Sequence, residues 1–434
     1  MQIQLREISE KAKRQKDYRF LNLYTMLSES NLKDSWRYLN KHSATGADRV
    51  SAKEYEQNLE GNIKDLVDRL KRKSYRSGLI RRKYIPKGKG KSRPLGIPVT
   101  EDKLLQCATK RILEAIYEED FYSFSYGYRP QRGAQTAVKK LKHTLQFGRY
   151  NWAVEADIKG FFDHIDHDIL LKMLEERVSD KSFIGLIRKW LKAGILEETQ
   201  EIIHPITGTP QGGIISPLLA NIYLHTVLDR WFEESVKPNI RGRAYLIRYA
   251  DDFIAVFQYR DDAERFYQTL PKRLSKYGLQ LAHDKSGIKP FSCHRRDSDR
   301  FDFLGFEFYW GISRKGRATV KSRTSRKRLR KSLAAFTEWI KEHRFQRFSK
   351  LISRLNRKLR GYYNYYGVIG NSRSLNEFFD RVVEIMFKWL NRRSQRRSFT
   401  WKIFGPMLRN HRILRPRITE RCSRQIDLFG VFVL

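Results

Sequence analysis

The sequence predicts an α+β fold, and three observations carry that prediction. Two runs with the alternation of β-strands, 244–248 and 253–257, flank a short turn, which is the pattern of an antiparallel hairpin. A third alternating run, 154–158, leads into a turn that contains Gly160. Farther along, leucines recur at every fourth position over 351–359 within a basic segment, which indicates helices with one cationic face.

Composition indicates a folded protein with a polyanionic partner. The 434 residues include 87 Lys and Arg against 48 Asp and Glu, so the net charge is +39. Aromatic residues make up 13% of the chain, and a large aromatic-rich basic protein suits nucleic acid better than a membrane surface. The charge is concentrated, because residues 312–360 hold 18 Lys or Arg and only two acids.

The stretch 202–228 carries no Lys, Arg, Asp or Glu. Prolines and glycines interrupt it, so we expect a buried loop and helix rather than a membrane span. The N-terminal residues lack the apolar core of a secretory signal, and the three cysteines are isolated in the sequence. These features favour a reducing cytoplasm and argue against a Cys-paired zinc module.

Adjacent carboxylates stand at the tip of the first hairpin, as Asp251 and Asp252. Like charges at neighbouring positions repel, so we expect a cation, most simply Mg²⁺, to hold them together. If the strand with Asp157 lies in the same sheet, its carboxylate can reach the same metal pair. Two such ions suit an in-line displacement at phosphorus. The alternatives are an ordinary Asp-rich turn and a strand-end acid that caps the next turn.

A glycine-rich block, 208–213, precedes a helix that should begin with Ser216 as N-cap and Pro217 at the first helical position. Gln211 can offer its side-chain amide to a ligand there. Upstream, 85–98 has the pattern of a basic hairpin whose Lys and Arg side chains can clamp a triphosphate. The alternatives are a structural loop for the first block and solvated surface charges for the second.

Taken in order, these blocks resemble the motifs of the reverse transcriptase family, in particular the bacterial group II intron-encoded reverse transcriptases, also called maturases. The match covers nearly the whole chain. The blocks that carry it are 32–48, 87–98, 124–130, 154–163, 210–212, 249–252, 278–285 and 303–306.

The resemblance implies the right-hand architecture of polymerases, with fingers, a palm built on an antiparallel sheet, and a helical thumb or X domain. It also implies how the domains follow one another along the chain. We expect an N-terminal extension with the first family motif over 1–78, fingers and palm over 79–310, the thumb over 311–400, and a short C-terminal segment, the place of a remnant DNA-binding region, over 401–434.

The resemblance assigns a catalytic role to one set of residues. Asp157, Asp251 and Asp252 would bind the catalytic metals. Ile158 falls among the metal-binding positions. Lys285 matches a lysine proposed to protonate the departing pyrophosphate. The implied cofactor is a pair of Mg²⁺ ions, for which Mn²⁺ can substitute.

A second set matches residues that contact the incoming nucleotide, namely Lys87, Arg93 and Gln211. Phe162, five residues after Asp157, matches the bulky residue that excludes a ribose 2′-hydroxyl and so selects deoxynucleotides. Plain core packing is the alternative for Phe162, and the two interpretations are compatible.

Nucleic-acid contacts are expected in two regions. Leu304 and Gly305 match the loop that grips the primer, and the basic thumb matches the part through which maturases hold intron RNA. Aromatic rings among arginines suit RNA, because bases stack on rings while phosphates meet guanidinium groups. For Tyr362 and Tyr363, the alternative is a tyrosine-rich helical core. The thumb residues assigned to this role are Arg326, Lys327, Arg328, Arg330, Arg360, Tyr362 and Tyr363.

The expected function is RNA-directed DNA synthesis from dNTPs on an RNA template with a DNA primer or target, joined to the splicing and mobility of a group II intron RNA. The expected location is the bacterial cytoplasm, and a homodimer is left open. The alternatives are a stand-alone group II-like reverse transcriptase of phage defence, repair or a CRISPR locus, and a splicing cofactor that needs no polymerisation. The Cys- and His-rich endonuclease domain of longer members is not expected, because only Cys422 lies in the terminal region.

Overall fold

The computed structural model describes residues 2–88, 91–209, 212–294, 298–393 and 398–420. The chain forms two compact units, each assembled from separate stretches of sequence. Helices and antiparallel strand pairs occur in both units, so the predicted α+β class is confirmed. Unit 1 comprises Met1–Arg132, Ala156–Ala255 and Tyr259–Ile288, and unit 2 comprises Gly133–Glu155, Val256–Gln258 and Lys289–Leu434.

The helices of unit 1 begin at residues suited to that position. Ser51 and Glu54 form a reciprocal capping box at α3, and Asp180 accepts backbone N–H groups at the start of α8. Helix α5 is buried over most of its length and packs against α1, α2 and α9. The helices are α1 (Gln2–Arg14), α2 (Glu29–Trp36), α3 (Ala52–Gln57), α4 (Leu59–Lys71), α5 (Thr100–Tyr117), α7 (His167–Glu175), α8 (Lys181–Leu191), α9 (Ser216–Leu224) and α10 (Arg260–Ser275).

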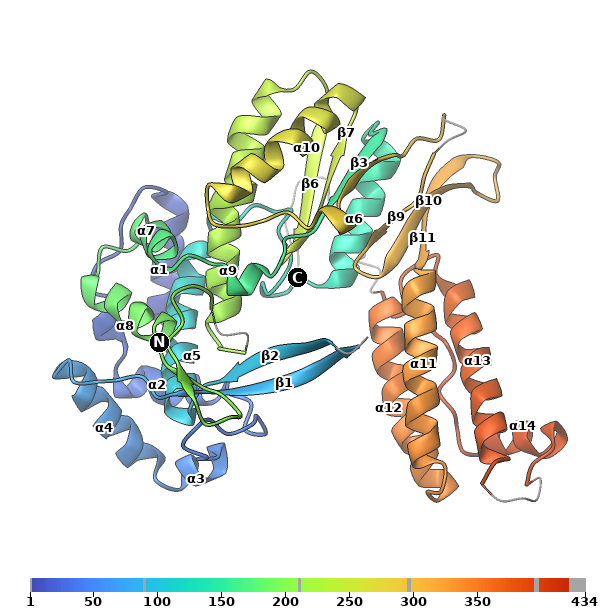
Figure 1. The fold of residues 1–434 in the computed structure, drawn as a ribbon, viewed down its shortest axis with the longest axis horizontal. Coiled ribbons are helices and arrows are strands. Elements are labelled where there is room, and N and C mark those ends of the chain that lie inside the picture. Colours follow the sequence, from blue (N-terminus) through green and yellow to red (C-terminus); the bar gives the residue numbers. More distant parts are fainter. Residues whose placement is uncertain (1, 89–90, 210–211, 295–297, 394–397, 421–434) are drawn as a thin grey trace. The chain divides into compact units, whose positions relative to one another are not determined.

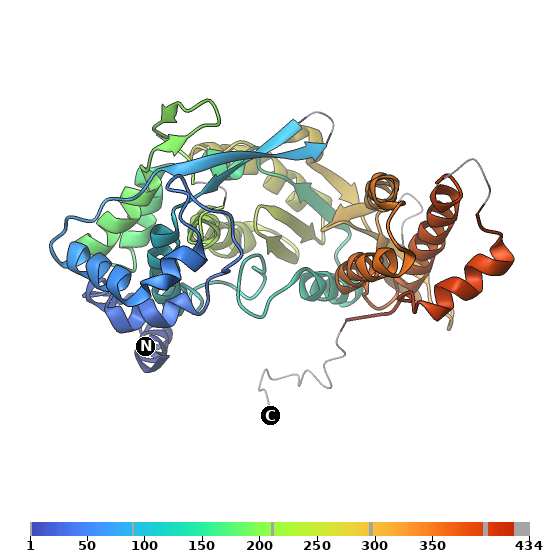
Figure 2. The same ribbon diagram turned by 90° about the horizontal axis from the view of Figure 1, so that it is seen from below.

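The predicted basic hairpin is confirmed as the antiparallel pair β1 (Ile80–Gly88) and β2 (Lys91–Ile97), seen as a long twisted ribbon in Figures 1 and 2. Two short strands, β4 (Ile195–Leu196) and β5 (Ile202–Ile203), extend this sheet in the order β2-β1-β4-β5. Both residues of β5 are exposed, and Ile206 is 89% exposed. The prediction that the uncharged stretch is buried from its start is therefore wrong, because short β5 lies at the sheet edge.

The second half of the uncharged stretch is buried, as predicted. Helix α9 is apolar and buried on nearly all sides, and it continues as wider π-helical turns over His225–Arg230 and Phe232–Val236. Ser216 is the first helical residue rather than the N-cap, which is Ile215 and makes no side-chain bond. The helix therefore begins one residue earlier than predicted. Pro217 still lies in the first turn, where no backbone N–H is needed.

A four-stranded sheet has the order β6-β7-β3-β8. Its strands are β6 (Ala244–Tyr249), β7 (Asp252–Phe257), β3 (Trp152–Ala156) and β8 (Gly287–Pro290). Strands β6 and β7 are the two arms of the predicted hairpin, which is confirmed. Strand β3 ends one residue before Asp157, so the prediction of a strand through 158 is too long. Single 3-10 turns lie at Tyr24–Met26, Phe161–Asp163, Lys237–Asn239 and His283–Lys285.

Unit 2 joins a three-stranded antiparallel sheet, order β11-β10-β9, to a helical bundle. Figures 1 and 2 show α11, α12 and α13 side by side. The predicted apolar stripe is confirmed, because Leu351, Leu355 and Leu359 lie in the bundle core. The elements are α6 (Ala134–Phe147), β9 (Phe301–Phe303), β10 (Phe306–Ile312), β11 (Ala318–Thr324), α11 (Arg326–His343), α12 (Phe348–Tyr366), α13 (Ser372–Leu390) and α14 (Trp401–Asn410).

Membrane-crossing length and apolarity do not coincide in any helix within the described part of the chain.

Candidate active site

The carboxylates at the tip of the hairpin stand on a tight, strained turn. Only Ala250 and Asp251 connect β6 to β7, and Asp252 is the first residue of β7. Ala250 has φ 56°, in the left-handed region that a residue with a Cβ adopts at a cost of roughly 1–2 kcal/mol. Asp252 is exposed and Asp251 is half-buried. The turn therefore presents two adjacent acids at the end of a rigid hairpin.

Asp157 follows β3, the strand beside β7. At the start of β3, the amide of Asn151 donates to the carbonyl of Phe257 at 2.9 Å, so the beginning of β3 meets the end of β7. The two strands are thus antiparallel, and the same register continued along them pairs position 157 with position 251. This is the neighbourhood that the sequence predicts for Asp157 and the hairpin acids.

Lys285 is brought to Asp157 by backbone pairing of two loops. The carbonyl of Asp157 accepts from the amide of Ala282 at 2.8 Å, and the amide of Asp157 donates to Ser286 Oγ at 3.2 Å. Lys285 Nζ forms an ion pair with Asp157 Oδ2. The bond to Asp157 raises the pKa of Lys285, and Asp284 and Asp252 raise it further through their charges. One cationic side chain is therefore stabilised by acids from both strand ends.

These acids suit a hard divalent cation. Asp157 and Asp252 both stabilise the positive charge of Lys285, and carboxylate oxygens are the donors that Mg²⁺ prefers. Within the described ranges, no three His, Cys, Asp or Glu side chains form a group that could hold a metal ion. In the structure, the carboxylate of Asp157 is instead paired with the ammonium group of Lys285. The charge and the donor chemistry of this site thus fit Mg²⁺, which would replace the ammonium as the partner of Asp157.

The basic hairpin contributes Arg93, an exposed residue of β2. The pKa of Tyr128 responds both to Arg93 and to the Ala250-Asp251 turn: burial raises this pKa, Asp251 raises it further, and Arg93 acts in the opposite direction. The sequence predicts no role for Tyr128, although it lies in the motif block 124–130. Lys87 lies near the end of β1, and its side chain is not described. Gln211 lies outside the described residues.

Phe162 lies in the 3-10 turn after Gly160 and is 6% exposed. Its carbonyl accepts from the amide of Thr209 at 2.8 Å, which places the glycine-rich block against this turn. Gly212 has φ 122°, and a Cβ there would lie 2.5 Å from the carbonyl oxygen of Gly96 in β2. Only glycine allows this approach. Phe162 is thus a packed residue near Asp157, as both interpretations of it require.

In unit 2, the Leu304-Gly305 pair forms the tight turn between β9 and β10. Both residues have positive φ, 51° and 79°, which suits the twist of a two-residue hairpin. Tyr365 Oη donates to the Leu304 carbonyl at 3.0 Å, and the Ser325 amide donates to the Gly305 carbonyl at 2.9 Å. These bonds fix the turn against the start of α11.

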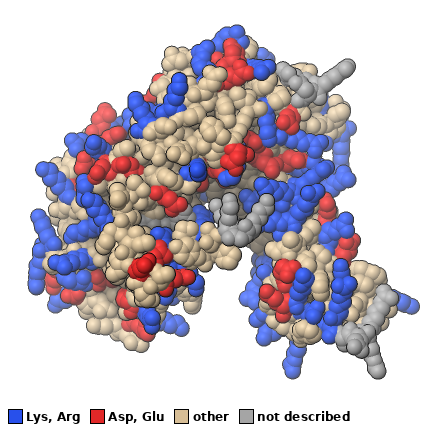
Figure 3. Space-filling model, in the orientation of Figure 1, with Lys and Arg blue, Asp and Glu red and all other residues tan. Residues whose placement is uncertain are grey.

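The first turns of α11 form a cationic surface. Four side chains on it are exposed, and Figure 3 shows Lys and Arg gathered around the β11–α11 junction. Helix α12 adds Arg360, which lines a cavity of about 380 Å³ together with Arg357 and Arg412. These positions match their assignment to nucleic acid in exposure and charge. The four exposed residues of α11 are Arg326, Lys327, Arg328 and Arg330.

The two tyrosines assigned to RNA pack against the core of the bundle. Tyr363 is fully buried, and the ring of Tyr362 stacks on Phe378 with 3.7 Å between centroids. A fully buried ring cannot stack on a base, so the assignment of Tyr363 is wrong. Tyr362 is half-buried with one ring face on Phe378, and its assignment stays a prediction. The alternative of a tyrosine-rich helical core holds for Tyr363. Spacing alone cannot distinguish them, because tyrosine suits both a core and an RNA surface.

Comparison with known families identifies this arrangement. The family described as reverse transcriptase (RNA-dependent DNA polymerase) matches residues 85–308, which include both carboxylate clusters. The chain belongs to the reverse transcriptase family. A second family, the group II intron maturase-specific domain, matches residues 326–404, which hold α11, α12 and α13. The right-hand polymerase fold expected from the sequence is confirmed by this membership. Reverse transcriptase domains use divalent metal ions and act on nucleic acid.

Several curated proteins are similar to this reverse transcriptase-family chain. The group II intron-encoded protein LtrA of Lactococcus lactis subsp. cremoris is 32% identical over 403 residues, and the match covers 74% of this chain and 65% of LtrA. Protein YkfC of Escherichia coli is 33% identical over 328 residues, covering 67% of this chain and 83% of YkfC. The putative COX1/OXI3 intron 1 protein of Saccharomyces cerevisiae is 38% identical over 159 residues, 37% of this chain and 19% of that protein.

Proposed function

We propose that this protein is an RNA-directed DNA polymerase that also binds a group II intron RNA and assists its splicing and mobility. One observation carries the polymerase part: Asp157 and the adjacent Asp251 and Asp252 lie at neighbouring strand ends within the reverse transcriptase match. The maturase-specific match to the cationic helices of unit 2 supports the intron part. The similarity to LtrA, a group II intron-encoded protein, agrees with both.

The side chains divide the work of nucleotide addition. Two bound Mg²⁺ ions would activate the primer 3′-hydroxyl and stabilise the leaving oxygen as the hydroxyl attacks the α-phosphate of a dNTP. Asp157, Asp251 and Asp252 would hold these ions. Lys285 lies beside Asp157, so its ammonium group would donate a proton to the departing pyrophosphate.

Substrate selection would come from residues around these acids. Arg93 and Lys87 would hold the triphosphate, and Gln211 would contact the same nucleotide. An Arg fork binds two phosphate oxygens at once, which orients the leaving group. Phe162 would exclude a ribose 2′-hydroxyl and so select dNTPs.

We assign residues 1–78 to an N-terminal extension, 79–310 to fingers and palm, 311–400 to the thumb or X domain, and 401–434 to a C-terminal segment, of which 421–434 lie outside the described residues. The RNA template, intron RNA and DNA primer are the proposed partners. A bacterial cytoplasm is the proposed location.

Primer extension on an RNA template tests the polymerase directly. The wild-type chain should make cDNA from dNTPs but not from NTPs, in the presence of Mg²⁺. Asp251→Asn keeps the size of the side chain and removes its charge, so synthesis should fall by several orders of magnitude while RNA affinity is retained. A variant that extends primers at the wild-type rate would refute the metal assignment.

A second function is favoured by the maturase-specific match: assistance to splicing that needs no polymerisation. In this case Asp251→Asn should support intron splicing at the wild-type rate in vitro, because the cationic helices that grip RNA are unchanged. A splicing defect equal to the synthesis defect would show that the two activities are not separable.

A further inference from the structure

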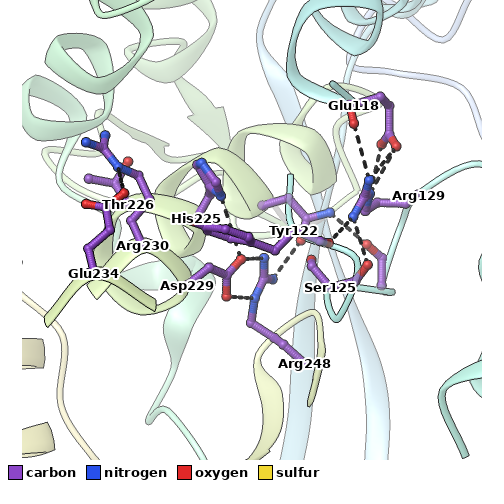
Figure 4. Close-up of polar contacts among 12 residues, drawn as sticks. Glu118, Tyr122, Ser125, Arg129, His225, Thr226, Asp229, Arg230, Glu234 and Arg248 are labelled. Atoms are coloured by element: carbon purple, nitrogen blue, oxygen red, sulfur yellow. Dashed lines mark hydrogen bonds and ion pairs between the residues drawn. The ribbon is translucent and has the colours of Figure 1, made fainter. Parts of the chain in front are cut away.

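Behind the catalytic turn lies a buried ion pair that the proposed mechanism does not use. Arg248, three residues before Asp251, and Asp229 are both completely buried. The Arg248 guanidinium donates to both oxygens of Asp229, at 2.8 and 2.6 Å. Figure 4 shows the two groups facing each other, with His225 beside Asp229. A forked geometry of this kind fixes the guanidinium plane.

The same guanidinium reaches the catalytic turn. Arg248 Nη1 donates to the carbonyl of Ala250, the strained residue of the turn, at 3.2 Å. It also donates to Asn221 Oδ1 at 2.9 Å. Asp229 orients the guanidinium, and the guanidinium in turn binds the turn carbonyl at the residue before Asp251.

Asn221 contacts both Arg248 and the backbone at Gly127. Its Nδ2 donates to the carbonyl of Gly127 at 2.7 Å, and both groups are buried. Gly127 lies so close to the turn that a Cβ there would be 2.3 Å from the amide nitrogen of Ala250. The turn is thus held between the guanidinium of Arg248 and the backbone at Gly127. Asn221 ties these two supports together.

Stability alone does not account for this arrangement. Taking two charges out of water costs several kcal/mol each, and buried ion pairs replaced by apolar residues of similar size often leave a protein equally or more stable. What such a pair does provide is a fixed geometry. Here that geometry is imposed on a backbone in the left-handed region, which persists only where its surroundings determine it.

We propose that Asp229, Arg248 and Asn221 are positioning residues that hold the Ala250-Asp251 turn in its strained conformation and so aim Asp251 and Asp252 at the reacting phosphate. This inference rests on the proposed function, in which these two aspartates hold the metal ions. The side chains of the three positioning residues are all buried. They act through the backbone of the turn.

The test replaces the pair by apolar residues of similar size, in the double variant Arg248→Met/Asp229→Leu. Single variants leave one buried charge without a partner, so they should lower the melting temperature sharply. The double variant should recover part of that loss, because no buried charge is left unpaired, although the Ala250 carbonyl and Asn221 lose a donor. Its kcat for primer extension should remain about 10²-fold below wild type, because a displacement near 1 Å at the reacting groups costs that much.

Mn²⁺ binding gives a readout that does not depend on activity. Free Mn²⁺, followed by electron paramagnetic resonance, should show weaker binding to the double variant than to the wild type. RNA affinity should be unchanged, because the cationic helices are untouched. A double variant that regains kcat and Mn²⁺ affinity together with its melting temperature would overturn the proposal.

A matched control lies elsewhere in unit 1. Arg177 and Asp120 form another ion pair, at 2.9 Å, with side chains 8% and 13% exposed. Arg177→Met/Asp120→Leu should change the melting temperature but leave kcat and Mn²⁺ affinity at wild-type values. Equal losses of kcat in the two double variants would assign the effect to burial of charge in general, and would also overturn the proposal.

The outcome separates this inference from the proposed function. Primer extension by the wild-type chain checks the function, and its absence would count against the polymerase. Mn²⁺ affinity would still decide the positioning role. The wild type and the double variant should differ in this affinity only if the ion pair holds the turn. Asn221→Ser offers a second variant, since it shortens the bridge to Gly127 while the ion pair remains. It should reduce kcat and Mn²⁺ affinity in the same direction.

Discussion

Burial sets the charge state of His225, which lies beside Asp229 behind the Ala250-Asp251 turn. Desolvation lowers the pKa of His225 to about 3, and the nearby guanidinium groups of Arg248, Arg230 and Arg129 act in the same direction. The imidazole is therefore neutral in the folded protein at any pH above about 3. Its ring packs against Phe121 with 5.5 Å between centroids, and its Nδ1 lies 4.0 Å from Asp229 Oδ2.

This depressed pKa predicts a loss of stability in acid. In the unfolded chain His225 takes up a proton below its ordinary pKa of 6.5, whereas in the folded chain it stays neutral down to about pH 3. Unfolding therefore binds a proton across that window, and the free energy of unfolding falls as pH falls, by about 1.4 kcal/mol per unit. His225→Phe removes this dependence. From pH 7.5 to 5.5, urea unfolding should show the wild type losing about 1.4 kcal/mol more than the variant.

A buried acid, Asp102, makes the free energy of unfolding change with pH in the opposite direction to His225. Burial raises the pKa of Asp102 to about 7, so its protonation favours the folded state as pH falls from 7 toward 3.8. Both proteins contain Asp102, and its contribution cancels in the difference between them. Identical pH dependence of wild type and His225→Phe would show that His225 is protonated in the folded state.

At the residue scale, the sequence predicts exposed charge better than buried charge. The hairpin acids were found because two carboxylates in a tight turn have an obvious chemical cost. Arg248 and Asp229 were missed because their partner is supplied only by folding. A signal was present: Arg248 interrupts an apolar strand just before the turn, and Asp229 is the first charge after the uncharged 202–228. A charge at such a position usually indicates a buried partner.

At the scale of elements, the exposed side of α11 carries the charge that an RNA backbone needs. Its first turn holds basic side chains, which oppose the helix dipole and are unfavourable for the isolated helix. Ser325 compensates by capping the amide of Arg328. The first turn of α11 thus carries positive charge at a cost in helix stability, which agrees with its proposed role in binding RNA.

Neutralising part of this surface should weaken RNA binding without affecting folding. For Lys327→Gln/Arg330→Gln, two lost phosphate contacts should flatten the plot of log affinity against log salt by about 1.4 on single-stranded RNA. The melting temperature should stay within about 1 °C, because both side chains are exposed. Filter binding at several salt concentrations measures the slope.

Lys53→Gln/Lys64→Gln is the matched control, since these two lysines are exposed on α3 and α4 and the net charge changes equally. If both double variants weakened RNA binding alike, net charge rather than the surface of α11 would be responsible.

Elements were predictable where local pattern and tertiary environment agree. The hairpin of β6 and β7 and the leucine stripe of α12 follow directly from period 2 and period 3.6. The exposed strand β5 was missed because an uncharged segment predicts burial, although its place at a sheet edge leaves it exposed. The start of α9 was one residue out because Ser at that position suits both N-cap and first turn.

At the scale of the whole molecule, the dominant quantity is the charge of +39, which the proposed nucleic-acid partners would explain. A polyelectrolyte partner releases its condensed counterions when bound, so affinity depends on salt more than on individual contacts. The cationic surface of α11 accounts for one part of this charge, and the basic β1–β2 hairpin for another.

The same charge predicts how RNA binding responds to salt. If six to ten phosphates are contacted, raising salt from about 50 to 200 mM should weaken binding by roughly 10³- to 10⁵-fold. The folded state should be little affected, which a melting curve at each salt concentration checks. The affinity of the α11 double variant should converge with that of the wild type at high salt and fall below it at low salt, since the variant releases fewer counterions. A flat response of the wild type would mean that binding comes from base and sugar contacts, and that the charge serves another purpose.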